Sequence, residues 1–315
     1  MSGANGGDGA VLVTGICGRL GRRLARRLHR KGPVIGVDKR PFSDRPSDVV
    51  HHQLDFRSNR TRDVLRDGVS ALVHLGVIHD PHGDSEQIHA SNLVSFQRLL
   101  ESVEAFSIKK LVLLSSANVY GPRPENPQFL DENAPLLGAA PFSDIRDLVE
   151  LDMACQSFLW KHPEVETVIL RPAHILGTVR NAPSNYLRLA VVPTLLGFDP
   201  MIQVVHQDDV VRAIELALSP SMRGIFNIAG PAPVPLSRAV QLLGRSTMPV
   251  PHGLARAALG QLFRLRVTSF PAPELDFIRY VCMVDDGRAR KVLGYQPEHD
   301  LAATLRAVDQ ERFVG

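Results

Sequence analysis

Three glycines near the N-terminus have the spacing of a dinucleotide-binding turn. Gly15, Gly18 and Gly21 follow one another at three-residue intervals, between a short apolar run and a helical pattern. Gly15 permits a tight turn, Gly18 lets the backbone approach a pyrophosphate, and Gly21 lets the helix pack closely on the strand. The first turn of the helix adds free amide hydrogens and the positive end of its dipole. This order of strand, glycine turn and helix predicts a dinucleotide cradle.

A carboxylate at the end of the next apolar run completes the cradle. Asp38 closes the run at 33–37, where it can accept hydrogen bonds from an adenosine ribose. Its charge favours the 2′-hydroxyl of NAD, whereas Arg40 could accommodate the 2′-phosphate of NADP. NAD is therefore the expected cofactor, with NADP as the alternative. A glycine-rich turn of some other α/β protein is the competing interpretation.

The composition is that of a globular protein with little net charge. The 315 residues are 44% hydrophobic and 22% charged, with a formal charge of +3, which indicates neither a nucleic-acid partner nor a membrane surface. The three cysteines (Cys17, Cys155 and Cys282) are far apart, so neither a disulfide framework nor a zinc site is expected. Without a membrane-spanning run or an apolar signal region, the chain is expected to be cytoplasmic.

A second motif follows a buried strand at 110–114. It reads Ser115-Ser116-Ala117-Asn118-Val119-Tyr120-Gly121. Together with the glycine spacing and a later Arg171-Pro172 turn, it resembles the extended short-chain dehydrogenase/reductase family, the NAD-dependent epimerases and dehydratases. The resemblance runs from about residue 10 to residue 308. It implies an α/β fold, a doubly wound parallel sheet of the Rossmann type with a smaller C-terminal substrate lobe.

The resemblance also implies a division of the chain and an assembly. The N-terminal residues are small, polar and rich in glycine, and are therefore expected to form a disordered tail. By the resemblance, two helices, one around 142–161, would form a homodimer. The expected units are the tail at 1–9, a dinucleotide-binding domain at 10–175 to which 202–229 return, and a substrate-binding lobe at 176–201 and 230–315.

By the same resemblance, cofactor contacts fall mostly at the ends of predicted strands. Asp55 and Phe56 would contact the adenine, and Asn92, opening a helix, would brace the catalytic region. The predicted cofactor-binding residues are Gly15, Ile16, Cys17, Gly18, Arg19, Leu20, Gly21, Asp38, Lys39, Arg40, Asp55, Phe56, Leu75, Gly76, Asn92, Ser115, Arg146 and Pro172.

The catalytic residues depart from the family pattern. Ser116 matches the serine whose hydroxyl hydrogen-bonds the reacting substrate oxygen. The family's Tyr-x-x-x-Lys pair is missing, because Phe142 and Arg146 stand in those positions. Arg146 could still bind the cofactor ribose and keep a positive charge near the nicotinamide, but neither residue can exchange a proton. Catalysis would need another acid/base.

Candidates for that acid/base lie on the same segments or on loops. They are Tyr120, Asp144, His79, His82 and His174. The three histidines are also the predicted substrate contacts. A metal site needs three or four converging ligands, and the loop around His79 and His82 supplies too few, so no metal is expected. His174 stands where many nucleotide-sugar enzymes have asparagine, which weakens the case for sugar-nucleotide recognition.

Three functions remain open for the chain. The first is an NAD(P)-dependent oxidoreductase or nucleotide-sugar epimerase/dehydratase with a non-standard acid/base. The second is a non-catalytic dinucleotide-binding sensor or partner-binding protein, which Phe142 favours. The third is a 3β-hydroxysteroid-dehydrogenase-like enzyme, which an apolar, arginine-flanked helix at 254–265 favours. All three bind a small molecule, and none requires nucleic acid or a membrane span.

Two local predictions concern the C-terminal third. Residues 185–196 read as a helix. Asp209 is expected to cap a following helix at 210–218 by accepting hydrogen bonds from its free amides, and His206 is expected to brace the turn before it.

Overall fold

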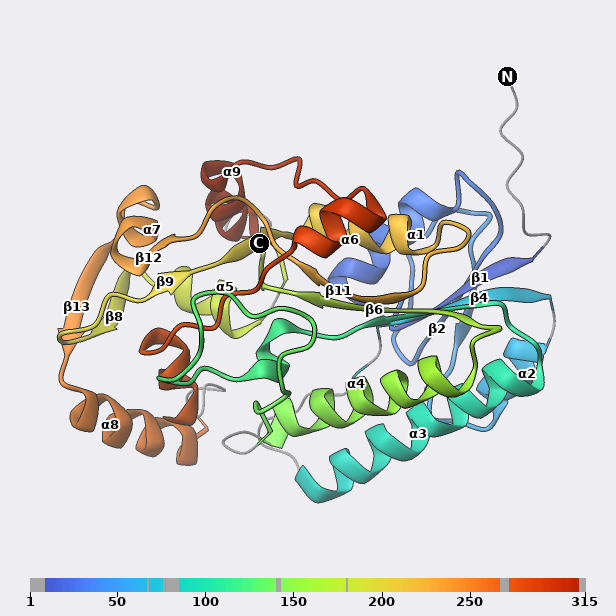
Figure 1. Ribbon diagram of the computed structural model, residues 1–315, viewed down its shortest axis with the longest axis horizontal. Helices are drawn as coiled ribbons and strands as arrows, with labels where there is room; N and C mark the ends of the chain where they lie inside the picture. Colours follow the sequence, from blue (N-terminus) through green and yellow to red (C-terminus); the bar gives the residue numbers. More distant parts are fainter. Residues whose placement is uncertain are drawn as a thin grey trace.

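The computed structural model describes residues 9–66, 68–75, 77, 85–139, 143–179, 181–266 and 272–311. Its centre is a seven-stranded sheet in the order β11-β6-β5-β4-β1-β2-β3 (Figure 1), with every neighbouring pair parallel. The strands are β1 (Ala10–Thr14), β2 (Val34–Asp38), β3 (Val50–Gln53), β4 (Val69–His74), β5 (Lys110–Leu114), β6 (Glu166–Pro172) and β11 (Gly224–Ile228).

The strand order reverses between β1 and β4, which creates a crevice at the carboxyl ends of these strands. β4 and β6 are buried along almost their whole length. Such continuous apolar strands are typical of parallel sheets covered on both faces. The predicted doubly wound parallel sheet is therefore confirmed.

Helices cover both faces of the sheet (Figure 1). α1 (Arg19–Leu28) and α6 (Gln207–Ala217) pack beside each other on one face, while α2 (Arg60–Arg66), α3 (Ser85–Ala105) and α4 (Ser143–Lys161) cover the other. The buried side chains form a separate apolar cluster on each side. In the described part of the chain, no helix combines the length and apolarity needed to cross a membrane.

A smaller lobe with its own apolar cluster extends beyond the carboxyl ends of β6 and β11 (Figure 1). Its strands pair two by two: β7 (His174–Leu176) with β10 (Val204–His206), β8 (Val191–Leu195) with β13 (Ser246–Val250), and β9 (Met201–Ile202) with β12 (Val234–Pro235). Its helices are α5 (Ala182–Leu187), α7 (Leu236–Leu242), α8 (His252–Arg264) and α9 (Leu301–Arg306). Shorter helical turns lie at Ala117–Tyr120, Ala272–Ile278, Ala289–Leu293 and Ala307–Glu311.

Two predicted helix boundaries are wrong. Residues 185–196 are not one helix, because α5 ends at Leu187 and β8 pairs in parallel with β13. A partner strand 55 residues later (Val191 pairs with Ser246) thus outweighs the local helical pattern, because strand formation depends on the neighbouring strand. Asn92 does not open a helix either. It lies inside α3, which begins at Ser85, and its buried side chain faces Asp147 of α4.

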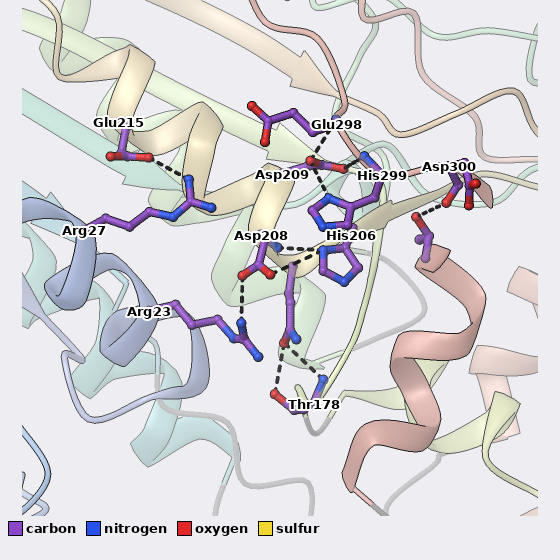
Figure 2. Close-up of polar contacts among 12 residues, drawn as sticks. Arg23, Arg27, Thr178, His206, Asp208, Asp209, Glu215, Glu298, His299 and Asp300 are labelled. Carbon is purple, nitrogen blue, oxygen red and sulfur yellow. Dashed lines mark hydrogen bonds and ion pairs between the residues drawn. The ribbon is translucent and has the colours of Figure 1, made fainter. Parts of the chain in front are cut away.

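The predicted cap of α6 is also wrong. α6 begins at Gln207, and the residue that caps it is His206, whose Nδ1 accepts a hydrogen bond from the Asp208 amide at 3.2 Å. The Asp209 carboxylate instead accepts from the Glu298 amide at 3.0 Å and contacts His299 Nδ1 at 2.9 Å (Figure 2). The carboxylate therefore anchors the C-terminal segment, a long-range contact that no local pattern reveals.

A buried ion pair joins β6 to α4. Arg171 Nε and Nη2 donate to the two carboxylate oxygens of Asp152 at 2.9 and 2.7 Å, and both side chains are almost completely buried. Ser115 Oγ and Gln156 Nε2 donate to the same carboxylate at 2.6 and 2.8 Å. The pair therefore has the additional hydrogen bonds that a buried charge requires.

Replacing Asp152 by alanine should lower the free energy of unfolding by about 3–5 kcal/mol, because it leaves the Arg171 charge buried and unpaired. Urea denaturation measures the change. Arg26→Ala serves as the control, since Arg26 pairs with Asp44 at an exposed site and its loss should cost about 1 kcal/mol or less. Equal effects of the two substitutions would contradict the assigned role of the buried pair.

His74, at the end of β4, is a buried histidine between two aromatic rings. Its ring lies 5.4 Å from that of Phe56 and 5.1 Å from that of Phe96, centroid to centroid. Nδ1 is 2.7 Å from Thr14 Oγ1, whereas Nε2 has no partner among the described residues. Burial lowers the pKa of His74 to about 3, so the ring is neutral at pH 7.

This histidine should make the fold sensitive to acid. Because its folded-state pKa lies below the unfolded value of about 6.5, its contribution to stability is complete above pH 6.5. The contribution is lost as pH falls toward 3, by up to about 1.4 kcal/mol per pH unit. In denaturation experiments at several pH values, the free energy of unfolding of His74→Asn should fall less steeply with decreasing pH than that of the unaltered protein, because asparagine does not titrate. An unchanged slope would exclude His74 as the cause.

Candidate functional site

The glycine turn between β1 and α1 adopts the conformation that its sequence predicts. Gly15 has a φ of 73°, in the left-handed region that favours glycine, and its amide donates to the Val37 carbonyl at 2.9 Å. The Gly18 amide donates back to the Gly15 carbonyl at 2.9 Å. One hydrogen bond therefore closes the turn internally, and another holds it to β2.

Close packing fixes the start of α1 against this turn. A Cβ atom on Gly21 would lie 2.6 Å from the carbonyl oxygens of both Gly15 and Ile16, so only glycine fits. On the other side, a Cβ on Gly36 of β2 would lie 2.5 Å from Ile16 Cδ1. No motif indicated a role for Gly36, although a glycine within a buried apolar strand is a sign of close approach.

The first turn of α1 is suited to a phosphate group. Gly18 caps the helix without a side-chain hydrogen bond, and the first turn holds no acidic residue. A Cβ on Gly18 would lie 3.1 Å from the Gly15 carbonyl oxygen. Because glycine has no side chain, a ligand can approach the backbone here. Exposed Arg19 and half-buried Leu20 follow it. The cradle thus fits the pyrophosphate of a dinucleotide.

Asp38, at the end of β2, is held by Arg40. Arg40 Nε and Nη2 donate to the two carboxylate oxygens at 3.0 and 2.8 Å, and the Cys17 amide donates to one of them at 3.1 Å. Burial opposes the charge of Asp38, but the hydrogen bonds from Arg40 outweigh it and lower the pKa of the carboxyl. Lys39, between them, is exposed. The carboxylate of Asp38 therefore remains ionised, and the positive charge of Arg40 balances it.

Arg40 also reaches back over the turn. Its Nη2 lies 3.8 Å from the position of a Cβ on Gly18, while 55% of the side chain stays exposed. Below it, the Cys17 thiol lies 3.2 Å from the Arg40 carbonyl oxygen, and burial raises the pKa of this thiol to about 11. The neutral thiol of Cys17 and the long cationic side chain of Arg40 thus border the predicted ribose position.

The end of β3 repeats the same arrangement. Arg57 binds Asp55 through its amide, Nε and Nη2 at 3.0, 2.9 and 2.5 Å, and the hydrogen bonds lower the pKa of Asp55. Arg57 Nη1 also donates to Ser91 Oγ of α3 at 3.0 Å. Phe56, between them, packs against His74. Both predicted adenosine-side carboxylates are therefore paired with an arginine two residues later.

Ser116 lies at the carboxyl end of β5 and is half-buried. Its Oγ accepts a hydrogen bond from the Asn118 amide at 3.1 Å, which caps the helical turn at 117–120. The neighbouring Ser115 points the other way, to the Asp152 carboxylate. The two serines of the motif thus have different surroundings, one half-exposed and one in the core.

Tyr120 lies in the buried network around Arg171. Its hydroxyl donates to Asn227 Oδ1 and accepts from Arg171 Nη1, both at 2.8 Å, and only 1% of the residue is exposed. Burial raises the pKa of this phenol to about 12. These contacts leave the hydroxyl poorly suited to exchanging a proton with substrate.

Arg146 lies in the first turns of α4 and faces α3. Nη1 donates to Glu86 at 3.1 Å, while Nε and Nη2 are buried without a partner in the described part of the chain. Two guanidinium donors are therefore available for a bound group. The predicted site residues Gly76, His79, His82 and Phe142 lie outside the described residues, as does the side chain of Asp144.

A polar cluster beside Arg146 joins Asn92 to three residues that no sequence motif indicated, His89, Asp147 and Glu150. His89 Nδ1 contacts Asp147 Oδ1 at 2.5 Å, and its Nε2 lies 3.2 Å from Glu150 Oε2. Asn92 Nδ2 donates to Asp147 Oδ2 at 2.7 Å. The signal was present in the spacing, because residues three apart on each helix lie on one face. The cluster fastens α3 to α4, the helix that carries Arg146.

An apolar pocket of about 80 Å³ opens between the sheet and the lobe. His174 borders it at the start of β7, in edge contact with Phe277 at 5.8 Å, and its buried surroundings lower its pKa to about 4. Pro172, two residues earlier, is buried at the end of β6. The lining consists of Asn118, Ile145, His174, Ala182, Pro183, Tyr186, Leu187, Ile202, Val204, Leu236, Phe277 and Ile278.

A larger pocket of about 180 Å³ lies between α2 and α3 and the turn after β3. Phe56 borders it, but its other lining residues are outside the predicted site.

Leu75, at the end of β4, donates its amide hydrogen to the Thr14 carbonyl at 3.2 Å and so holds β4 beside β1.

His206, Asp208 and His299 form a group with potential metal ligands within 4.8 Å of one another. The two rings stack at 3.7 Å, and Asp208 pairs with Arg23 of α1 at 2.8 Å (Figure 2). With Nδ1 of each histidine engaged by the start of α6, these contacts tie the C-terminal segment to α6 and α1.

Comparison with known families and proteins gives consistent matches. The model of the NAD dependent epimerase/dehydratase family matches residues 11–229. The uncharacterized protein Rv0501 of Mycobacterium tuberculosis is 31% identical, over 91% of this chain and 80% of its own length. The 3-diazoavenalumate denitrifying reductase of a Streptomyces species is 24% identical, over 92% of this chain and 96% of its own.

Solved structures share the fold at lower identity. A UDP-glucose 4-epimerase of Stenotrophomonas maltophila, with bound NAD and formylated UDP-arabinopyranose, superposes with a TM-score of 0.75 at 18% identity, covering 97% of this chain and 98% of its own. A short-chain dehydrogenase/reductase superfamily protein of Agrobacterium tumefaciens with bound NAD gives 0.73 at 23% identity, covering 96% and 97%.

Arg40 should influence the choice between NAD and NADP. In Arg40→Ala the Asp38 carboxylate loses its neutralising partner and should repel a 2′-phosphate. The ratio of NAD to NADP affinity should then rise on the order of tenfold, as calorimetry with each dinucleotide would measure. Arg26→Ala, on the exposed side of α1, is the matched control. A ratio that is unchanged or shifted toward NADP would refute this role.

Proposed function

Because the chain belongs to the NAD dependent epimerase/dehydratase family, we propose that it binds NAD and exchanges a hydride between this cofactor and a small-molecule substrate. The family match confirms the resemblance inferred from the motifs. The observation that carries the proposal is the cradle at 15–21, where packing excludes any side chain on Gly21 and the start of α1 is left open to an anion. NAD in structures of the same fold supports the choice of cofactor.

In the proposed reaction a substrate alcohol becomes a carbonyl. Bound NAD would supply the acceptor for the hydride on the carbon that carries the hydroxyl, and the hydroxyl proton would pass to a separate acceptor. We assign Ser116 the role of orienting the substrate oxygen. Its Oγ already accepts from the Asn118 amide, so its own proton is available to donate to the substrate.

Arg146 would support the cofactor without taking part in proton transfer. One of its nitrogens binds Glu86, and two more, which have no partner among the described residues, suit the hydroxyls of the nicotinamide ribose. A guanidinium stays charged at any physiological pH, so Arg146 cannot replace the proton chemistry of a tyrosine. Its contribution is position and charge.

The acid/base is then among the remaining candidates. Tyr120 is disfavoured because both hydrogen bonds of its hydroxyl go to buried protein groups. His174 borders the pocket, but its lowered pKa makes it a neutral hydrogen-bond partner and a weak proton acceptor. His79, His82 and Asp144 stay predictions.

The finer proposals concern substrate and assembly. Family membership and structural neighbours crystallised with nucleotide sugars support a nucleotide-sugar epimerase or dehydratase activity. A homodimer through α3 and α4 is supported by the packing of these helices and by Met153 and Trp160 of α4, which are 55% and 74% exposed.

A second candidate function is NAD binding without turnover. Phe142 in the tyrosine position and the engaged hydroxyl of Tyr120 both favour it. The chain would then act as a dinucleotide-dependent sensor or partner-binding protein, with the same cradle and no hydride exchange.

Ser116→Ala distinguishes the two functions. If the chain is an enzyme, loss of this hydroxyl should lower kcat on the order of 100-fold, because a donor to the reacting oxygen is removed, while NAD affinity stays unchanged. Nicotinamide absorbance, followed with nucleotide sugars and hydroxysteroids, measures the rate. Exposed Ser43→Ala is the control. Tight NAD binding with no absorbance change for any substrate would support the sensor instead.

A further inference from the structure

The helix α8 rests on the lobe with one side only. It lies at the outer end of the lobe and packs against the turn at Ala272–Ile278 (Figure 1). Three apolar residues of α8, Ala255, Leu259 and Phe263, recur at four-residue intervals and are half-buried. No residue of the helix is buried. A surface helix normally buries its apolar stripe against the core, so the apolar residues of α8 need another explanation.

A second apolar stripe of this helix is exposed to solvent. Leu254 and Leu262 of α8 and Leu265 directly after it are between 42% and 70% exposed. Their separations of eight and three residues place all three on one side of the helix. The exposed apolar surface continues at Leu196, whose amide donates to the Val250 carbonyl just before α8 begins.

The arginines of this segment have no acidic partner. Arg256 and Arg264 of α8 and Arg266 after it are exposed, and no carboxylate of the described residues pairs with any of them. On α1, by contrast, even the exposed Arg26 pairs with Asp44. The positive charge at α8 is therefore uncompensated.

The surrounding sequence is also free of negative charge. Between Glu215 and Glu274 the chain has six arginines and neither aspartate nor glutamate, although 33 acidic residues occur in the whole chain. The formal charge of +3 conceals this segment, because the acidic residues lie elsewhere. A negatively charged surface is therefore the partner that complements α8.

The combination of leucines and unpaired arginines distinguishes between possible partners. A nucleic acid would bind the arginines but leave the leucines in water. A second copy of the helix would cover the leucines but bring the arginines of both copies together, where like charges repel. An anionic lipid surface satisfies both groups, since leucine side chains enter the acyl region while the long arginine side chains reach the phosphates.

We propose that α8 docks on the surface of a membrane that contains anionic lipids, with the leucine stripe at 254–265 facing the acyl chains. Such binding is peripheral, because a helix of 13 residues lies along a bilayer and does not cross it. The turn at 272–278, on which α8 rests, also supplies residues to the apolar pocket. Docking would thus bring this pocket close to the membrane. The inference does not depend on the proposed reaction.

Co-sedimentation of the full chain with lipid vesicles tests the proposal. One set of vesicles contains phosphatidylcholine alone, and the other contains equal parts of phosphatidylcholine and phosphatidylglycerol. Each of the three arginines should contribute about fivefold, so binding to the anionic vesicles should be on the order of 100-fold tighter. High salt should weaken it through screening. Equal affinity for the two kinds of vesicle, or binding to neither, would overturn the proposal.

Variants locate the binding on α8. Leu254→Glu removes an apolar side chain and adds a repelled charge, so it should weaken binding to the anionic vesicles about tenfold or more. Val292→Glu makes the same charge change at an exposed position of the turn at 289–293 and should have a much smaller effect. Arg264→Gln should cost about fivefold, whereas Arg30→Gln, at an exposed position of α1, should not.

Two measurements accompany these variants. Circular dichroism during heating should give the same unfolding temperature for all four, because the replaced side chains are exposed. Light scattering gives the oligomeric state. A dimer that Leu254→Glu alone dissociates would identify a second copy as the partner of α8 and overturn the membrane proposal. Equal losses of vesicle binding in Leu254→Glu and Val292→Glu would overturn it too, since net charge and not α8 would then decide the binding.

Discussion

The site depends on one buried ion pair. Arg171 and Asp152 are charged groups in the core, and hydrogen bonds with Ser115, Gln156, Tyr120 and the Glu132 carbonyl compensate their desolvation. Ser115 at the end of β5, Tyr120 in the following turn and Asn227 on β11 all belong to this network. Because these groups must satisfy the charges, the segment that carries Ser116 has one defined course.

This network also explains why a tyrosine next to a reactive serine is not automatically an acid/base. The phenol of Tyr120 has two partners, Arg171 and Asn227, and its burial makes deprotonation unfavourable. A residue of the right type at a plausible spacing is thereby assigned to the scaffold. In the proposed reaction centre, Ser116 and Arg146 would position groups without exchanging a proton at neutral pH.

The two ends of the site differ in their electrostatics. On the adenosine side, Asp38 and Asp55 are each clasped by an arginine, so the charges there are balanced in pairs. At the other end, the described lining of the pocket is mostly apolar and its histidine is neutral. The two ends of the proposed site therefore differ in charge.

The sequence by itself determined the fold class, the glycine turn and the motif around Ser116. These features are local, since a turn needs glycine at Gly15 and parallel buried strands need continuous apolar runs. Only the tertiary structure decided the roles of Asp209 and Tyr120 and the strand at Val191–Leu195, because their partners lie far along the chain. Pairing of distant residues is decided by the packed whole, which local patterns do not record.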